Sequence, residues 1–123
     1  IVAVAISQLP VGIDIQHISP KMEKIAHKFL LEKQLKGIKE MSQFSLESLH
    51  VHWGTKEALF KAYGKGQLDF KQHLHLNWQK EFIPEGDYFD AYIFKADKKT
   101  DYNGQYEKIF EDYLFCIVTK KDN

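Results

Sequence analysis

The chain of 123 residues has a single cysteine, no excess of either charge and no long hydrophobic run. With only Cys116, no disulfide can form within the chain, and such sparse cysteine use is typical of cytoplasmic proteins. Lysine plus arginine equals aspartate plus glutamate at 17 each, so no global field favours nucleic acid or a membrane surface. No stretch approaches the roughly 20 apolar residues of a membrane span, and no signal-peptide pattern is found. We therefore expect a cytoplasmic protein that binds neither nucleic acid nor membrane.

What the chain does contain is enough apolar material for one packed domain. Hydrophobic residues make up 44% and aromatic residues 14% of the sequence. A chain of this length suits one domain or half of a larger one. It opens on "IVAVAIS", a strand-like run without an initiator methionine. We expect residues 1–123 to form one domain that belongs to a longer protein.

The hydrophobic pattern predicts an α+β fold, with an antiparallel sheet and helices packed on one face. The β-rich stretches are expected to be strands, the first two forming a hairpin, at 1–6, 11–16, 73–78, 87–96 and 112–121. The polar segment between the last two, which contains Asn103 and Gly104, is expected to be a turn.

Two helices are expected between the second and third strands. The first covers 20–30 with Ser19 as N-cap, and the pattern then weakens around Gly37. The second covers 46–63 and is ended by Gly64. Its predicted apolar stripe consists of Leu46, Leu49, Trp53, Phe60 and Tyr63.

Two carboxylates stand in apolar surroundings. Asp14 interrupts the apolar run of "VGIDIQ", and Glu57 lies four residues after Trp53 and three before Phe60, beside the apolar stripe. A lone buried carboxylate is costly unless something pairs with it. If the helix packs on the hairpin, one cation could satisfy both groups, and two hard oxygen ligands suit Mg²⁺.

Lysines around Glu57 suggest a phosphate beside that cation. Lys56 and Lys61 flank it, and Lys65 follows within a Gly-Lys-Gly loop. Gly64 and Gly66 would let backbone N–H groups approach a phosphate closely.

Ordinary structural roles explain the same residues. Glu57 and Lys61 have the i, i+4 spacing of a solvated ion pair, Asp14 could cap a turn, and both carboxylates could accept internal hydrogen bonds only. The histidines form no convincing metal site, because His50 and His52 point apart on a helix and His73 and His75 lack a third ligand. His17 and His27 lie near the first motif and remain candidates for a phosphate contact.

The combination of "VGIDIQ" with "WGTKEALFKAYGKG" about 40 residues later resembles the two signature motifs of the 4'-phosphopantetheinyl transferase superfamily. "KFLLEKQL", with Phe29 followed by Glu32, is similar to the segment that links them in the family. Either motif alone is a weak signal, whereas both in this order and at this separation are strong.

The resemblance implies a Mg²⁺-dependent enzyme that transfers phosphopantetheine from coenzyme A to a serine of an acyl or peptidyl carrier protein, releasing 3',5'-ADP. Asp14 and Glu57 match the metal carboxylates, and Glu57 also matches the base that deprotonates the serine. Lys56 and Lys61 match lysines that contact the phosphates of coenzyme A or support the site. The resemblance thus implies Glu57 and Lys61 as catalytic residues. The candidate coenzyme-binding residues are therefore the lysines Lys56, Lys61 and Lys65 together with Gly64 of the glycine loop.

Two departures from the family pattern bear on this prediction. Many two-domain members have Glu or Asp where Gln16 stands, so Gln16 would bind the metal directly or through a water. The family's Ser-x-Ser-His segment is missing, and in two-domain members it precedes the first motif. We therefore expect the C-terminal half of a long-type transferase, which would associate with its missing N-terminal half or with itself.

The prediction that the chain is half of a transferase has one alternative. It also requires a particular arrangement of the site residues. The alternative is a non-catalytic half-domain that keeps the fold and binds coenzyme A or a partner. An active site requires the oxygens of Asp14 and Glu57 to lie within about 5 Å, Lys61 to point into their cleft, and Trp53 to be buried at its floor. An uncovered apolar patch is expected near 1–16 and the helix of Trp53.

Overall fold

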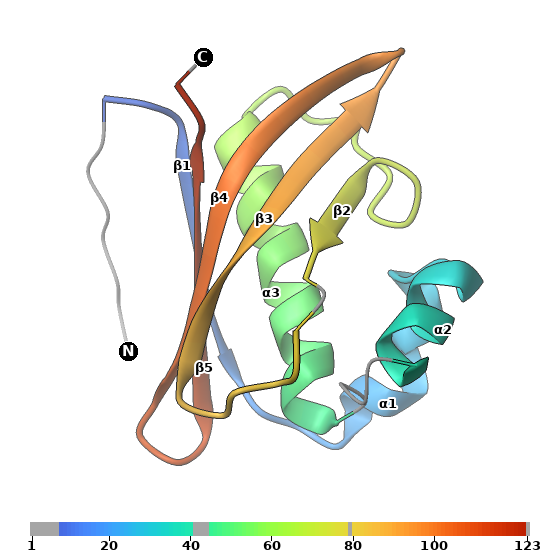
Figure 1. Ribbon diagram of the computed structural model, residues 1–123, viewed down its shortest axis with the longest axis vertical. Helices are drawn as coiled ribbons and strands as arrows, with labels where there is room; N and C mark the ends of the chain where they lie inside the picture. The colour runs from blue at the N-terminus through green and yellow to red at the C-terminus, as the bar shows by residue number, and fades with distance from the viewer. Residues whose placement is uncertain (1–7, 41–44, 79, 123) are drawn as a thin grey trace.

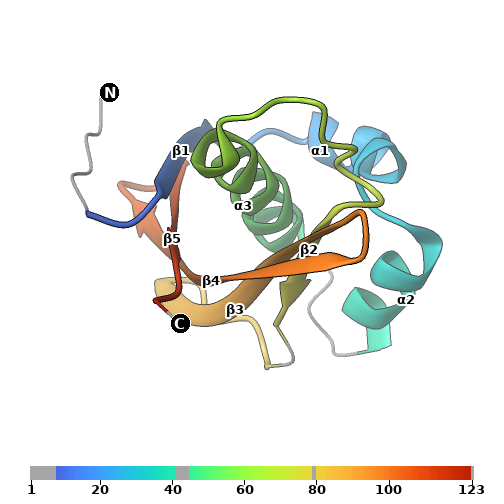
Figure 2. The same cartoon turned by 90° about the horizontal axis from the view of Figure 1, so that it is seen from above.

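The computed structural model describes residues 8–40, 45–78 and 80–122, and within them one antiparallel sheet curls around a long helix (Figures 1 and 2). The strands are β1 (Val11–His17), β2 (Leu74–Asn77), β3 (Gly86–Lys95), β4 (Lys98–Ile109) and β5 (Tyr113–Lys120). The helices are α1 (Lys21–Ile25), a following 3₁₀ turn (Ala26–Lys28), α2 (Glu32–Glu40) and α3 (Leu46–Tyr63). The sheet order is β1-β5-β4-β3-β2, and every pair is antiparallel. The α+β class is confirmed, while the predicted strand at 1–6 lies outside the described residues.

Helix α3 begins and ends where the sequence predicts. Ser45 and Ser48 form a reciprocal capping box, each side chain accepting the other's backbone N–H at 3.1 Å. At the other end Gly64 has a left-handed φ of 70°, and its N–H donates to the carbonyl of Phe60. No helix in the described part of the chain is long and apolar enough to cross a membrane.

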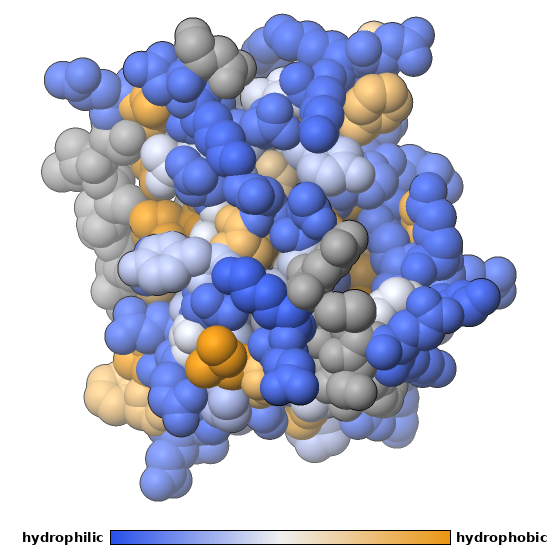
Figure 3. Space-filling view, viewed as in Figure 1, coloured by the Kyte–Doolittle hydropathy of each residue, from blue (hydrophilic) through white to orange (hydrophobic). Residues whose placement is uncertain are grey.

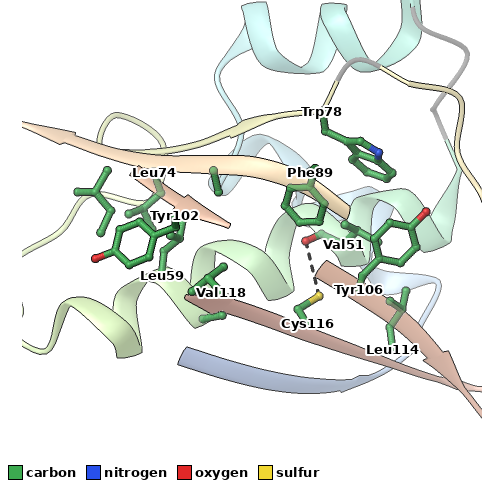
Figure 4. Packing of buried hydrophobic residues seen from close by; sticks show 13 residues of the cluster. Val51, Leu59, Leu74, Trp78, Phe89, Tyr102, Tyr106, Leu114, Cys116 and Val118 are labelled. Carbon is green, nitrogen blue, oxygen red and sulfur yellow. Dashed lines mark hydrogen bonds between the residues drawn. The ribbon is translucent and has the colours of Figure 1, made fainter. Parts of the chain in front are cut away.

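The predicted apolar stripe of α3 does not follow one buried side, because Leu46, Leu49 and Trp53 join a second cluster, Tyr63 packs against the main core and Phe60 is 36% exposed. Toward the sheet, Val51, Ala58 and Leu59 belong to the main core, together with Leu74, Trp78, Phe89, Tyr102, Tyr106, Leu114, Cys116 and Val118 (Figure 4). Toward α1 and α2, Leu49 and Trp53 pack in a second cluster with Phe29 and Leu30. The stripe prediction was incomplete because it assumed one buried face, whereas α3 lies between a sheet and two helices.

Cys116 is buried in the main core, as expected, and its thiol lies 3.9 Å from the carbonyl oxygen of Val51. Burial raises the pKa of this thiol to about 12, which makes it unreactive near neutral pH.

The segment around Gly37 is a helix, contrary to prediction. Helix α2 continues through Gly37, and Ile38 on its inner side is only 3% exposed. A mid-helix glycine costs up to about 1 kcal/mol, and packing of Ile38 and Leu35 in the second cluster offsets it. The first helix is also shorter than predicted, since α1 ends at Ile25 and Pro20, not Ser19, occupies its N-cap position.

The predicted turn containing Asn103 and Gly104 is wrong, because both residues lie inside β4. The chain reverses earlier, at Ala96 and Asp97, where positive φ angles of 52° and 62° close a two-residue hairpin. Gly104 serves packing: an added Cβ there would lie 2.5 Å from the ring of Phe89 on β3. The glycine of the Asn-Gly pair is therefore explained by the aromatic ring that packs over the strand, and it does not form a turn.

Lys56 holds α3 to two other segments from inside the protein. Its side chain is fully buried, and its ammonium donates to the carbonyls of Phe29 and Phe70 at 2.7 Å and to Oε1 of Gln34 at 3.2 Å. All three donors are therefore used within the fold. Burial lowers the pKa of Lys56 to about 7, and the nearby carboxylate of Asp69 opposes this shift.

Replacing Gly12 and Gly37 by alanine is expected to have opposite effects on stability. A Cβ at Gly12 would collide with the carbonyl oxygen of Ala58, so Gly12→Ala should lower the free energy of unfolding by about 1–3 kcal/mol or more. A Cβ at Gly37 meets nothing within 4 Å, so Gly37→Ala should raise it by about 0.5–1 kcal/mol. Urea denaturation followed by circular dichroism measures both, and a neutral Gly12→Ala would contradict the close packing of β1 on α3.

The stability of the protein is expected to rise with pH above neutrality because of Lys56. Its pKa in the fold, about 7, lies below its ordinary value of 10.5, so between these values the unfolded chain binds more protons. The free energy of unfolding should therefore increase as pH rises from 7 to 8.5, by on the order of 1 kcal/mol from this group. Lys56→Met should flatten the profile measured by urea denaturation, whereas the exposed Lys33→Met should leave it unchanged. Equal slopes in all three proteins would refute the shifted pKa.

Candidate functional site

Strand β1 turns its polar residues toward α3. Side chains alternate along a strand, and Asp14 and Gln16 lie on the same side as Gly12, which touches Ala58 of α3. Gly54 makes the approach possible from the helix side. An added Cβ there would lie 2.7 Å from the thiol of Cys116, 3.1 Å from Nε2 of Gln16 and 3.4 Å from Oδ2 of Asp14.

Gly54 is thus a site residue that sequence reasoning missed. Its signal was available, because a glycine inside a predicted helix, three residues before Glu57, marks a place where another group approaches closely.

Asp14 faces a lysine from α3. Nζ of Lys61 lies 3.0 Å from Oδ1 of Asp14 and also donates to the carbonyl of Ile13 at 3.0 Å. The side chain of Asp14 is only 12% exposed, while that of Lys61 is 49% exposed. The carboxylate is therefore held at the base of the contact, and the lysine reaches it from the solvent side.

Glu57 lies near Asp14 and Lys61, whose charges influence its carboxyl group. Its pKa is raised, first by partial burial and then by the negative charge of Asp14, while the positive charge of Lys61 opposes the shift. The three charged groups are therefore close enough to influence one another. Lys61 therefore reaches Asp14 from the helix that carries Glu57; the shared cleft and the 5 Å separation of the two carboxylates stay predictions.

A chain of hydrogen bonds orients Asp14 from its other side. Nε2 of Gln16 donates to Oδ2 of Asp14 at 2.7 Å, and Oε1 of Gln16 lies 2.6 Å from Nδ1 of His50. Nε2 of His50 accepts the backbone N–H of Ser19 at 2.9 Å, which leaves the ring proton on Nδ1 to donate to Gln16. Gln16 therefore presents its amide N–H to the carboxylate and its oxygen to His50, and its predicted binding of a metal, directly or through a water, stays a prediction.

Three other predicted coenzyme-binding residues are placed away from the carboxylates or engaged elsewhere. The ammonium of Lys56 uses its three hydrogen-bond donors inside the fold. In this structure it therefore supports the site and cannot donate to a phosphate. The N–H of Gly64 closes α3. Lys65 lies over the ring of Tyr63, 5.5 Å from its centre, and lines a different hollow of the surface.

Trp53 is half-buried between Phe29 and Phe70, with ring centres 5.2 and 5.4 Å away. It belongs to the second cluster, so the prediction that it is buried at the floor of the cleft is not met.

The remaining histidines take structural or surface positions. His73 accepts the N–H of Asp69, and His75 stacks on Tyr92. His17 packs edge-on against Tyr113, and His27 is exposed.

The donor set fits a small, hard cation. In the described ranges no group of three or more His, Cys, Asp and Glu side chains converges; Asp14 and Glu57 are the two carboxylates of the candidate site. Burial first and the charge of Asp14 second raise the pKa of Glu57, and a divalent cation would relieve the repulsion between the two carboxylates. Two carboxylates with several waters are a usual protein contribution to bound Mg²⁺.

Comparison with known proteins agrees with this geometry. Residues 10–118, which include β1 and α3 with the entire cleft, match the 4'-phosphopantetheinyl transferase superfamily. A 4'-phosphopantetheinyl transferase of Aneurinibacillus migulanus, gsp, is 33% identical over 125 residues, which cover 96% of this chain and 49% of that protein. The chain thus spans about half the length of the curated relative it matches. With this match over most of its length, and with Asp14 of its first motif held against Lys61 of its second, the chain belongs to the 4'-phosphopantetheinyl transferase superfamily.

Proposed function

We propose that this domain transfers 4'-phosphopantetheine from coenzyme A to a serine of an apo acyl or peptidyl carrier protein, as a Mg²⁺-dependent holo-carrier-protein synthase in the cytoplasm. The observation that carries the proposal is the 3.0 Å contact of Lys61 with Asp14, beside Glu57, whose pKa the charges of both residues influence. These are the residues of the two motifs that match the family's metal and catalytic positions. Family membership supports the transferase class.

Glu57 is suited to remove the proton of the acceptor hydroxyl. Its raised pKa makes it a stronger base than an ordinary glutamate. It is half-buried on a rigid helix, so its carboxylate is held in place for an incoming serine. The proton would move from the serine Oγ to a carboxylate oxygen of Glu57 as Oγ attacks the β-phosphate of coenzyme A.

Lys61 and Asp14 would supply charge at the phosphates. The lysine is half-exposed at the mouth of the cleft and carries a positive charge that can move between Asp14 and an incoming phosphate. Asp14 is kept in one orientation by Gln16 and His50, so its oxygens need no rearrangement during the reaction. Bound Mg²⁺ would neutralise the pyrophosphate and stabilise the charge that develops there.

The outer face of β1 and β5 supports a partner for this domain. Ile13 lies opposite Ile117 and Ile15 opposite Phe115, and these half-buried side chains point away from α3. The face seen in Figure 3 is mostly hydrophilic, with hydrophobic residues in separate areas. We propose that the β1–β5 face packs against a further half of the protein, or a second copy, to complete the coenzyme site. Coenzyme A binding without transfer would instead identify a non-catalytic half-domain.

Glu57→Gln should abolish transfer while the fold persists, because it removes charge and basicity but keeps the shape of the side chain. Transfer is measured by mass spectrometry of an apo carrier protein incubated with coenzyme A and Mg²⁺. Glu40→Gln, which makes the same change at an exposed position of α2, should retain full activity. Near-normal turnover by Glu57→Gln would rule out its role as the base.

The metal proposal predicts a crossover in thermal stability for Gln16→Glu. The new carboxylate would replace an amide donor to Asp14, so without Mg²⁺ the melting temperature should fall below that of the unaltered chain. With Mg²⁺ the additional ligand should give a larger upward shift than in the unaltered chain, while Asp14→Asn should show almost none. Differential scanning fluorimetry with and without Mg²⁺ tests this, with Ca²⁺ as a comparison ion. Identical Mg²⁺-induced shifts of the melting temperature in all three proteins would rule out the proposed metal site.

A further inference from the structure

A second charged feature lies where α3 ends, on the inner side of the sheet. Side chains alternate along each strand, so Lys95 continues the inner face of Ile93, Lys98 that of Tyr102, and Lys120 that of Val118. Ile93, Tyr102 and Val118 are all buried in the main core. Each of three adjacent strands thus has a lysine at the end of its row of core-facing side chains.

These lysines line a hollow of about 370 Å³, which we call the lysine pocket, together with Lys65 from the loop after α3. Its other walls mix hydroxyl and apolar groups, from Pro10, Ala62, Tyr63, Ile93, Ala96, Thr100 and Tyr102. None of these residues is acidic. Asp14 and Glu57 are also absent from the walls, so the pocket is distinct from the carboxylate cleft.

The positive charges in the pocket are poorly compensated. Lys95 and Lys98 lie directly opposite each other in the β3–β4 register, an arrangement that is unfavourable for like charges. Nζ of Lys95 donates to the carbonyl of Gln67, and Lys65 lies over the ring of Tyr63. Lys98 and Lys120 have no side-chain hydrogen bond or ion pair with the described residues.

The neighbouring lysines differ, because their positive charges are compensated by aspartates. Lys99 and Lys121, each one residue further along, face the other way and pair with Asp101 and Asp90 at 3.6 and 2.7 Å. Within the described residues, the same strand ends therefore carry ion-paired lysines outside and lysines without an ion pair inside. An anion in the pocket would reduce the repulsion between these ammonium groups.

We propose that the lysine pocket binds the phosphate group of a small phosphate compound. Several ammonium groups around one hollow suit a dianion with three acceptor oxygens better than a single carboxylate. The hydroxyls of Tyr63 and Thr100 add neutral hydrogen-bond donors, and Ala62 and Ile93 offer apolar contact to an attached group. The phosphate could come from the 3'-phosphate end of coenzyme A, a source that rests on the proposed function, or from free phosphate.

The test compares two double variants of the full chain that lose the same charge from neighbouring positions. Lys98→Ala/Lys120→Ala empties the pocket of its two unpaired lysines, and Lys99→Ala/Lys121→Ala removes the outward pair. Lys98→Gln/Lys120→Gln, which keeps side-chain bulk, repeats the pocket change in case alanine disturbs the fold. Binding of inorganic phosphate, coenzyme A and dephospho-coenzyme A is measured by titration calorimetry and NMR at low salt without Mg²⁺.

We expect both pocket variants to bind phosphate at least about tenfold more weakly than the unaltered chain, since each lost lysine removes a charge-assisted hydrogen bond. The outward variant should stay within about twofold. Weaker binding of coenzyme A but not of dephospho-coenzyme A would identify the coenzyme's 3'-phosphate as the occupant. Loss confined to inorganic phosphate would identify free phosphate.

Two results would overturn the inference. One is an unaltered chain without saturable phosphate binding, and the other is equal weakening in the outward variant, which would indicate general charge attraction. Glu57→Gln separates this test from that of the proposed function, because it should abolish transfer and leave phosphate binding at the pocket intact.

Discussion

The contact between β1 and α3 is the constraint on which the rest of the structure depends. Two glycines permit it, Gly12 from the strand and Gly54 from the helix, since a Cβ at either would meet atoms of the other element or of the strand beyond. The close approach brings Asp14 against the helix face that carries Glu57 and Lys61. With larger residues at these positions, the carboxylates would stand apart and each would only be solvated.

The same closeness governs the electrostatics of the cleft. Asp14 is nearly buried, so it needs partners, and it has a lysine on one oxygen and an amide on the other. The pKa of Glu57 is raised first by its partial burial and then by the charge of Asp14, while the positive charge of Lys61 opposes the shift. A site that joins a basic carboxylate to an oriented one in this way is suited to phosphoryl-group chemistry, where positioning and charge stabilisation do most of the catalysis.

Lysines in this chain take three environments that their sequence positions do not distinguish. Lys56 is buried and ties α3 to the segments of Phe29 and Phe70. Lys61, five residues later, reaches the cleft at the protein surface. Lys98 and Lys120, far apart in sequence, line the same pocket on the inner side of neighbouring strands. Each outcome depends on which face of an element the residue occupies and what packs there.

Local signals were sufficient for the class of fold, the ends of α3 and the two carboxylates, because capping residues, glycine stops and an acid in an apolar run act within a few residues of chain. They failed where distant segments decided the outcome. Gly37 stays helical because Ile38 is buried, and Gly104 lies within a strand because the ring of Phe89 covers it. The sequence by itself thus determined which groups could carry chemistry, whereas only tertiary packing decided which lysine meets Asp14, that Gln16 turns its amide to it, and that three strands share one pocket. The physical reason is that hydrogen-bond partners and buried neighbours come from segments tens of residues apart, and nothing in a local window specifies them.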